Sequence, residues 1–414
     1  MVKLLWRRRG PSDSTERSAP HVLIIVENLP IGTEPRTRKE AQDLLRAGYR
    51  VSVVTRSAPE NDGCRLWPGL TLLEYPSPSE PQSLPGYCRE YVVSFVWAVV
   101  LSGLARLRGR IDILQLAQPP DIYFPLARLH KLLGATVLLD QHDLMPELFV
   151  VRGGSAARPV TSLLRWLERR TQRVTDETIC TNDYQKARLI NAGGDEDQVT
   201  IVRNGPVLDR VRDAVPDDYL RGNHSFLCCW VGFMGRQDRL DLALKAVAHV
   251  IWDLGRKDTK FVFLGDGECF DEMRALSSQF GLDPWVSFPG WVAESSVFAH
   301  LATADLAMDA SLQDDVSPVK VFEYMAFGVP FVSFDLQETR SIGAGAGAYV
   351  RPGDVPALAS ELVALLDDSD RRADMGRLGR ERVHDELAWE HQATKYLAVM
   401  QRLSARQAPV VTSP

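Results

Sequence analysis

The segment with the densest set of residues suited to chemistry runs from position 313 to 330 and reads QDDVSPVKVFEYMAFGVP. Ser317 followed by proline is typical of a helix start, and Gly328 is typical of a helix end. On such a helix Lys320 and Glu323 lie three positions apart and share one face. A surface ion pair is one interpretation. Because the flanking residues are apolar, we favour the other: a carboxylate for ribose hydroxyls, with a lysine and a free helix N-terminus for a diphosphate.

Three earlier loops also follow apolar runs and carry glycine. The loop GFMGRQDR at 232–239 holds Gly235, Arg236 and Arg239 in front of a predicted helix at 240–254. Glycines there let the backbone approach a ligand closely, and a helix N-terminus favours an anion. An ordinary turn with two solvated arginines is the alternative.

The next two loops could border the same ligand. The sequence GDGE at 265–268 includes Gly265 and Gly267, a G-x-G pattern that many α/β turns have for conformational reasons alone. The sequence FPGWV, which ends at Val292, places Trp291 at a strand end, where it could flank a planar base or simply pack.

In the N-terminal half, the segment DQHDLMPE at 140–147 places three carboxylates and His142 directly after an apolar strand. Ionisable groups concentrated in a strand-end loop indicate a functional site. A zinc site is one alternative, but no second histidine or cysteine lies at ligand spacing. Structural hydrogen bonding by the histidine is the other.

These loops must be positioned by the elements between them, and the chain alternates short apolar runs with longer helical patterns. Continuous apolar strands separated by helices predict parallel sheets that are covered on both faces. One series of strands is expected at 21–26, 51–55, 113–117, 136–140 and 177–181, and a second at 226–233, 260–264, 286–288, 305–308, 330–334 and 348–350. Two series predict an α/β fold with two doubly wound, Rossmann-like domains, which bind ligands at the carboxyl ends of their strands.

The domain boundaries follow from breaks in this alternation. We expect a disordered tail at 1–20, an N-terminal domain at 21–205, a C-terminal domain at 206–386 and a terminal helix at 387–405. The central break is placed by Asn204-Gly205-Pro206 and the polar stretch after it.

Composition narrows the class of protein. The 414 residues include 48 Lys and Arg against 54 Asp and Glu, a net charge of −6, and are 45% hydrophobic, which excludes a disordered or fibrous chain. A mildly acidic chain argues against nucleic acid as a partner, because general nucleic-acid binding needs a basic footprint. The six cysteines form no C-x-x-C, and Cys228 and Cys229 lie in an apolar run, so we expect buried thiols and a cytoplasmic location.

One apolar stretch raises the question of a membrane. The run from Tyr91 to Ala105, YVVSFVWAVVLSGLA, is followed by Arg106, Arg108 and Arg110. At about 15 residues it is shorter than the roughly 20 that span a bilayer, so we expect a largely buried helix. The alternative is a helix lying on the anionic inner face of the membrane, which would suit an enzyme with a lipid acceptor. The N-terminal residues lack the apolar run of a secretory signal.

Taken together, these residues resemble the retaining sugar-nucleotide glycosyltransferases of family 4, in particular the branch that acts in bacterial polysaccharide and glycoconjugate assembly. In that family two acidic residues lie eight positions apart, and the second is followed by a small-residue helix and G-x-P. Asp315 and Glu323 stand at this spacing (323 − 315 = 8) before Gly328-Val329-Pro330. Further similar stretches, in consistent order between about His21 and Trp389, are Glu27-Asn28, Arg36 with Glu40-Ala41, Pro119-Pro120-Asp121, residues 140–147, Val202-Arg203-Asn204-Gly205-Pro206, Met234-Gly235 with Gln237-Asp238, and Phe334-Asp335-Leu336 with Glu338-Thr339-Arg340.

The resemblance implies a GT-B fold, in which two Rossmann-like domains face a cleft and the last helix crosses back to the first domain. The C-terminal domain would bind a nucleoside-diphosphate sugar, guessed to be a UDP-sugar, and the N-terminal domain the hydroxyl of a glycan, a lipid-linked sugar or a secondary metabolite. By this resemblance Glu323 would hold the ribose, Asp315 the donor sugar, and Arg236 with Lys320 the diphosphate, while His142 would approach the transferring sugar. Further donor-binding positions are Gly235, Arg239, Gly265, Gly267, Trp291, Val292, Ser317 and Val319.

The sequence departs from the family pattern at two of these positions. The first acid is usually glutamate and is Asp315 here, and the usual phosphate-binding lysine after Gly235 is missing, with Asp238 near that point. Arg239 or Lys320 would then supply the second cation.

The chemistry implied is a hexosyl transfer that retains anomeric configuration and needs neither cofactor nor metal, because fixed cations would stabilise the departing diphosphate. Two other hypotheses stay open at this point. One is a GT-B sugar-nucleotide epimerase, and the other is a non-catalytic subunit that binds a sugar nucleotide.

Overall fold

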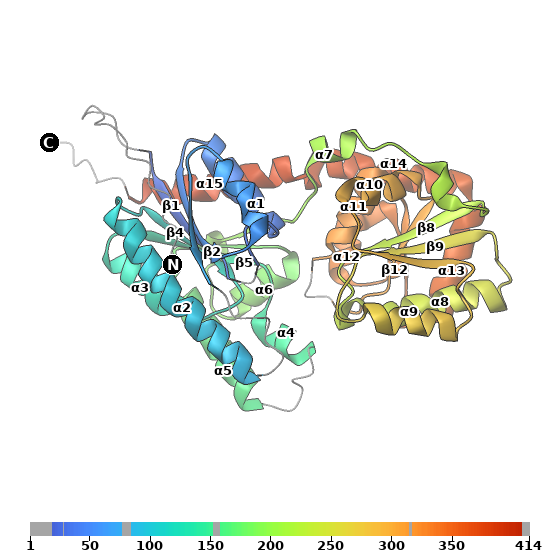
Figure 1. Ribbon diagram of the computed structural model, residues 1–414, viewed down its shortest axis with the longest axis horizontal. Coiled ribbons are helices and arrows are strands. Elements are labelled where there is room, and N and C mark those ends of the chain that lie inside the picture. The colour runs from blue at the N-terminus through green and yellow to red at the C-terminus, as the bar shows by residue number, and fades with distance from the viewer. Residues whose placement is uncertain (1–18, 28, 77–83, 152–157, 314–316, 408–414) are drawn as a thin grey trace. The chain divides into compact units, whose positions relative to one another are not determined.

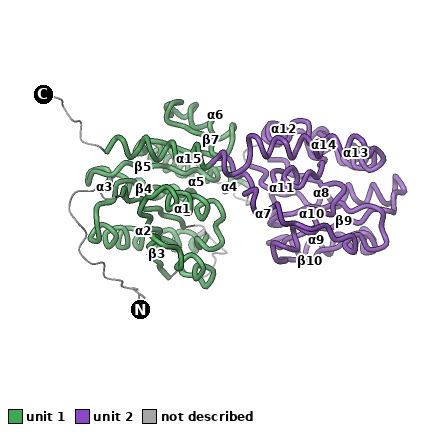
Figure 2. Tube along the Cα trace, turned by 90° about the horizontal axis from the view of Figure 1, so that it is seen from above, with its two compact units in different colours: residues 1–202, 393–414 green, residues 203–392 purple. Residues whose placement is uncertain are grey.

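The computed structural model describes residues 19–27, 29–76, 84–151, 158–313 and 317–407. These divide into two compact units, coloured separately in Figure 2. Unit 1 comprises residues 1–202 and 393–414, and unit 2 comprises residues 203–392. The chain therefore leaves unit 1 three residues before the expected boundary at 205 and returns to it six residues after 386. The expected disordered tail lies almost wholly outside the described residues.

Unit 1 contains a seven-stranded sheet of parallel strands in the order β3-β2-β1-β4-β5-β6-β7 (Figure 1). Its strands are β1 (His21–Ile25), β2 (Arg50–Arg56), β3 (Leu70–Tyr75), β4 (Ile113–Gln118), β5 (Thr136–Gln141), β6 (Glu177–Cys180) and β7 (Val199–Ile201). Its helices are α1 (Pro35–Arg46), α2 (Leu84–Leu107), α3 (Phe124–Leu132), α4 (Met145–Val151), α5 (Arg158–Gln172), α6 (Asp183–Asn191) and the C-terminal part of α15 (Trp389–Ala405).

Unit 2 contains a six-stranded parallel sheet in the order β10-β9-β8-β11-β12-β13. Its strands are β8 (Phe226–Val231), β9 (Thr259–Leu264), β10 (Val286–Gly290), β11 (Leu306–Asp309), β12 (Phe331–Phe334) and β13 (Gly347–Val350). Its helices include α7 (Leu208–Arg212), α8 (Leu240–Ala248), α9 (Phe270–Gln279), α10 (Glu294–Thr303), α11 (Val319–Phe327), α12 (Gln337–Gly343), α13 (Val355–Asp367) and α14 (Ser369–Arg382).

The apolar runs are continuous because each sheet is buried on both faces. In β8, Cys228 and Trp230 pack with α8 and α13, whereas Leu227 and Cys229 pack on the other face with α11. Successive side chains of a strand point to opposite faces, so both faces need apolar residues. The expectation of two Rossmann-like parallel sheets is thereby confirmed, and all six cysteines are free, five of them buried.

Two strands were not predicted. Strand β3 has only half-buried residues over most of its length, and β7 is three residues long. Both lie at the edges of their sheet, where the apolar signal is weakest. The other strands lie within two residues of their expected positions.

Helix α2 is longer than expected, at 24 residues. Its segment Pro85–Leu107 is long and apolar enough to cross a membrane by length and composition. One stripe, with Ala98, Leu101 and Ala105, is buried against the sheet. Another stripe exposes valines, with Val92 63% and Val96 53% accessible. The expectation of a largely buried helix is therefore wrong for that second face.

Candidate functional site

Three strand-end loops of unit 2 contact one another at the carboxyl edge of its sheet. The backbone N–H of Met234 donates to Asp266 O at 2.9 Å, and Cys269 N–H donates to Met234 O at 3.0 Å. The backbone N–H of Gly265 donates to Gly290 O at 3.1 Å. The loops after β8, β9 and β10 therefore form one surface, as parallel topology predicts for consecutive strand ends.

Glycine is required at this surface by close backbone approach. Gly265 has φ +134°, and a Cβ there would overlap the backbone oxygen of Gly232. Gly267 has φ +157°, and its Cβ would lie 2.7 Å from Met234 N. The G-x-G pattern thus packs two loops together, which is a conformational role in addition to any contact with a ligand.

We expect Gly265→Ala to lower the stability of unit 2 by about 2–3 kcal/mol and to abolish donor-induced stabilisation, because the loops after β8 and β9 must separate. Gly255→Ala is the matched control: Gly255 also has positive φ, at +68°, but nothing lies within 4 Å of its Cβ position. Thermal unfolding of both variants, with and without nucleotide sugar, makes the comparison. Equal losses in the two variants would contradict the close-approach argument.

Lys320 on α11 forms ion pairs with two carboxylates at this surface. Its Nζ lies 2.7 Å from Asp238 Oδ1 and 3.3 Å from Asp309 Oδ1, and 5.0 Å from the centre of the Trp230 ring. Burial acts to lower the pKa of Lys320, but Asp309 and Asp238 raise it above its usual value, so the ammonium stays charged. The side chain is 11% accessible, which makes it a fixed cation.

Asp238 links Lys320 to the loop after β8. Its Oδ2 accepts the backbone N–H of Gly235 at 3.3 Å, and its Oδ1 accepts from Lys320. A backbone N–H and an ammonium are the donors that a phosphate group uses. The Asp238 carboxylate therefore occupies the two donors that a phosphate group would use. Lys320 together with Asp238 and Asp309 carries a local charge of −1.

The two arginines of this loop differ. The guanidinium of Arg236 is exposed and has no recorded hydrogen bond or ion pair within the described part of the chain, while its backbone N–H donates to Glu268 at 3.3 Å. Arg239, at φ 49°, instead makes a two-point pair with Asp241 at 2.8 and 3.0 Å. Arg236 is therefore the cation of this loop that is available to a ligand.

The start of α11 differs from the expectation. The helix begins at Val319 with Pro318 as N-cap, and no side chain caps it. Ser317 is not the N-cap; its buried hydroxyl has no hydrogen-bond partner among the described residues. Pro318 has a helix-compatible φ of −77°, but its ψ of 80° is not helical, so the first helical residue is Val319. The end is as predicted, because Gly328 adopts a left-handed conformation with φ +67°.

The remaining predicted residues of unit 2 lie around this surface or outside the described residues. Glu323 is half-buried, one turn after Lys320 on α11, and Val319 is exposed at its first turn. Trp291 is 78% accessible after β10, so the packing interpretation is wrong for it, and Val292 is half-buried. Asp315 lies outside the described residues.

In unit 1, His142 is held from three sides at the end of β5. Its backbone N–H donates to Gln118 O at 2.9 Å, and its carbonyl accepts Gln185 Nε2 at 2.9 Å. Its ring Nε2 lies 2.7 Å from Asp140 Oδ2. Burial lowers the pKa of His142, but the Asp140 carboxylate overcomes this effect and raises it to about 9. The ring is therefore an imidazolium at neutral pH.

A buried chain of polar groups connects this histidine to α1 and α15. Arg36 on α1 donates to Asp140 at 2.9 Å and lies 3.2 Å from Glu40, which accepts from Gln115 Nε2 at 2.7 Å. The hydroxyl of Tyr396 on α15 donates to Gln115 Oε1 at 2.6 Å. Burial raises the pKa of Glu40 to about 8, with Asp140 adding to the effect, whereas Arg36 and His142 hold the pKa of buried Asp140 at about 2.

Arg36 and Glu40 were noted from the sequence only as points of resemblance, and Gln115 and Tyr396 were missed. An isolated glutamine inside the apolar strand at 113–117 was the available signal, because a buried amide needs partners. The alternative of a zinc site at residues 140–147 gains no support, since no group of three His, Cys, Asp or Glu side chains suited to a metal occurs among the described residues.

Comparisons with known proteins identify related sequences. The family model "Glycosyl transferase 4-like domain" matches residues 32–205, and "Glycosyl transferases group 1" matches residues 225–368. The chain is 31% identical over 170 residues to a GDP-mannose-dependent monoacylated alpha-(1-6)-phosphatidylinositol monomannoside mannosyltransferase of Corynebacterium glutamicum, covering 39% of this chain and 43% of the relative. It is 27% identical over 258 residues to a 2-deoxystreptamine glucosyltransferase of Streptomyces kanamyceticus, covering 60% and 65%. The alignments thus span 43% and 65% of the lengths of these two relatives.

Solved structures show the same fold. Sucrose-phosphate synthase from Thermosynechococcus elongatus superposes with a TM-score of 0.76 at 17% identity, over 94% of this chain and 100% of that one. The Anabaena HepE structure in complex with UDP-glucose superposes with a TM-score of 0.71 at 14% identity, over 93% and 99%. With the two consecutive family matches, the two Rossmann-like units show that the chain belongs to the GT-B glycosyltransferases of family 4.

Proposed function

We propose that the protein is a retaining glycosyltransferase that moves a sugar from a nucleoside-diphosphate sugar to a hydroxyl acceptor. The observation that carries the proposal is the strand-end surface of unit 2, where Lys320, the glycine-rich loops and exposed Arg236 come together. Unit 1 would bind the acceptor, and His142 would contact the transferring sugar.

The proposed roles follow from charge development. As the bond between the sugar and the diphosphate breaks, positive character grows on the sugar and negative charge on the diphosphate. Arg236 and Lys320 would stabilise the departing diphosphate more than the intact donor. Glu323 would accept from the ribose hydroxyls, Asp315 would contact the donor sugar, and Trp291 would border the base.

The proposed transfer needs no nucleophile from the protein. The acceptor oxygen bonds to the anomeric carbon on the face that the diphosphate leaves, and a donor phosphate oxygen takes the acceptor proton. This differs from retaining glycoside hydrolases, which form a covalent bond to a carboxylate. Metal independence is part of the proposal, because the protein's own cations would take the metal's role; full activity in excess EDTA is the expected result.

Donor and acceptor identity are part of the same proposal. A UDP-sugar remains our first expectation, and one structural neighbour is described with UDP-glucose. GDP-mannose is the alternative, because several relatives are named as GDP-mannose-dependent. A lipid-linked acceptor and contact of α2 with the inner face of the membrane are supported by the exposed valines of that helix.

A screen of UDP- and GDP-sugars by thermal shift, followed by detection of released nucleoside diphosphate with acceptor present, tests the proposal. A donor at 100 times its dissociation constant raises stability by about 2.7 kcal/mol, or roughly 5–10 °C for a domain of this size. Binding without release would indicate the non-catalytic subunit, which the pairing of Lys320 with two carboxylates favours as second candidate. Isomerised donor in the protein alone would indicate an epimerase.

A further inference from the structure

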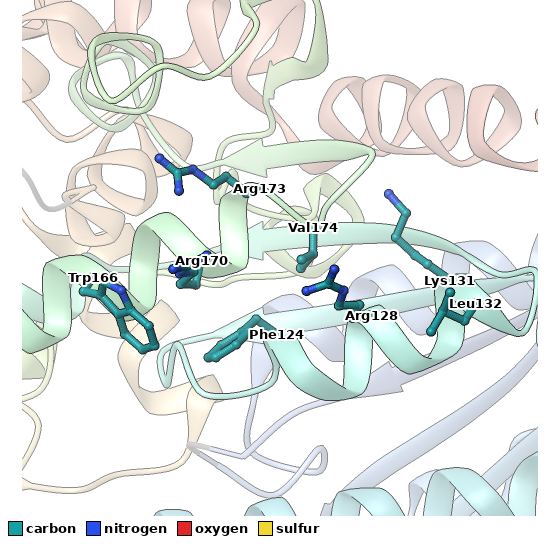
Figure 3. Close-up of a pocket in the computed structure, with 8 residues that line it drawn as sticks. All are labelled: Phe124, Arg128, Lys131, Leu132, Trp166, Arg170, Arg173 and Val174. Atoms are coloured by element: carbon teal, nitrogen blue, oxygen red, sulfur yellow. The ribbon is translucent and has the colours of Figure 1, made fainter.

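Helices α3 and α5 of unit 1 border a groove of about 510 Å³ with two kinds of lining (Figure 3). Phe124 and Trp166 pack edge to face, with ring centres 5.9 Å apart, and Leu132 and Val174 add apolar surface. The rest of the lining is basic: Arg128, Lys131, Arg170 and Arg173. The groove belongs to neither the strand-end surface of unit 2 nor the His142 cluster.

The positive charge of this groove is largely uncompensated. Lys131 pairs with Asp176 at 2.8 Å. The guanidinium groups of Arg128, Arg170 and Arg173 make no ion pair or hydrogen bond within the described residues, and that of Arg170 lies over the Trp166 ring at 5.2 Å. Four cations against one carboxylate give a local charge of +3 on a chain whose net charge is −6. Such a concentration of unpaired guanidinium groups suits a phosphate ligand.

Exposed leucines lie beside the basic groove. Leu132 is 81% accessible, and Leu129 and Leu133 are also exposed at the end of α3. Arg106 Nη2 donates to Leu133 O at 2.8 Å, which joins the end of α3 to the end of α2, where Leu107 is 84% accessible. Exposed leucines next to arginines favour a bilayer surface over a dissolved polyanion, because a polyanion offers nothing to cover them.

We propose that the groove between α3 and α5 binds the phosphate of an anionic phospholipid at a bilayer surface, with the neighbouring leucines entering the headgroup boundary. This deepens the membrane contact proposed for α2, on which it rests, by adding a site with selectivity for anionic headgroups. It involves no group assigned to donor, acceptor or catalysis.

Co-sedimentation of the full chain with phosphatidylcholine vesicles, with and without phosphatidylglycerol, tests the proposal. We expect at least about 100-fold tighter binding to the anionic vesicles, falling with salt, because each of the three arginines near such a surface contributes about fivefold. The triple variant Arg128→Ser, Arg170→Ser, Arg173→Ser should lose about 100-fold in affinity for anionic vesicles and little for neutral ones.

The matched control removes the same charge from unit 2: Arg212→Ser, Arg274→Ser and Arg377→Ser, three exposed arginines in ion pairs within single helices. Equal binding by the groove variant and the wild type, or an equal loss in the control, would overturn the proposal. So would stabilisation by inorganic phosphate that needs the three groove arginines but no lipid, which would assign the groove to a dissolved anion.

Two further measurements separate an error in the groove assignment from an error in the membrane contact of α2 or in the proposed function. Val92→Ser with Val96→Ser on α2 should weaken binding to both kinds of vesicle and leave the anionic preference intact. Transfer to a soluble acceptor should be unchanged in the groove variant. Selective vesicle binding without any sugar transfer would uphold the groove and reject the proposed function.

Discussion

Replacing Lys320 with methionine is expected to lower kcat by about 10²–10³-fold, the usual cost of removing one fixed group that stabilises a developing negative charge. The reason is its position: Nζ is buried, fully charged and aimed at the loop after β8 through Asp238. Steady-state release of nucleoside diphosphate provides the measurement. Lys245→Met, which removes an exposed lysine of α8, is the control and should keep wild-type kcat.

A fall in activity could also follow from unfolding, because Lys320→Met leaves Asp238 and Asp309 without their cation. Asp309 is only 2% accessible at its side chain, and losing one member of a buried pair costs about 3–5 kcal/mol. The double variant Lys320→Met, Asp238→Asn removes one of the two stranded charges. It should recover part of the melting temperature and none of the activity. Recovery of activity together with stability would show that Lys320 acts only in folding.

The sequence predicted the sheets of both units well, because burial on both faces gives continuous apolar strands that are easy to recognise. It failed at β3 and β7, where edge position makes that signal weak. It also misplaced the start of α11, since serine before proline suggested an N-cap, whereas the backbone of Pro318 takes that position.

The candidate site was predicted by residue type but not by pairing. Lys320 and Glu323 were correctly placed on one helix, yet the Lys320–Asp238 pair joins positions 82 apart and leaves no mark in local spacing. The Asp140–Arg36 contact spans 104 positions in the same way. Such pairs depend on which strands are neighbours in the sheet, and strand order cannot be read from periodicity. The partner of a charged residue was therefore the least predictable part of the site.

Replacing Asp140 with asparagine is expected to make sugar transfer depend on pH in a way that identifies His142. Asp140 raises the pKa of His142 to about 9, and without it burial should bring the pKa to 6.5 or lower. At pH 8 the imidazolium fraction then falls from about 0.9 to about 0.03, so kcat/KM should drop about 30-fold. At pH 6 the difference should be much smaller, and less than about twofold for a pKa of 6.5.

Stability should follow the same titration. A raised histidine pKa contributes stability that is fully present below pH 6.5 and is lost as pH rises through about 9. Because the pKa of Glu40 is raised to about 8, a further part of the stability is lost between pH 4.5 and 8. The change in stability between pH 8 and 9 therefore reports on His142. In that interval the wild-type melting temperature should fall with pH, and that of Asp140→Asn should stay level.

A merely structural role for Asp140 would give a different result. Loss of the Arg36 contact alone would lower activity by the same factor at pH 6 and pH 8, although NMR would still show the pKa of His142 falling from about 9. Asp253→Asn is the matched control, because Asp253 pairs with His249 at 2.6 Å in the π-helical turn His249–Asp253 that follows α8, and neither residue belongs to a strand-end cluster. Its pH profile of transfer should equal that of the wild type. A pH-independent defect in Asp140→Asn would therefore remove His142 from the chemistry and leave the Asp140 cluster as part of the core of unit 1.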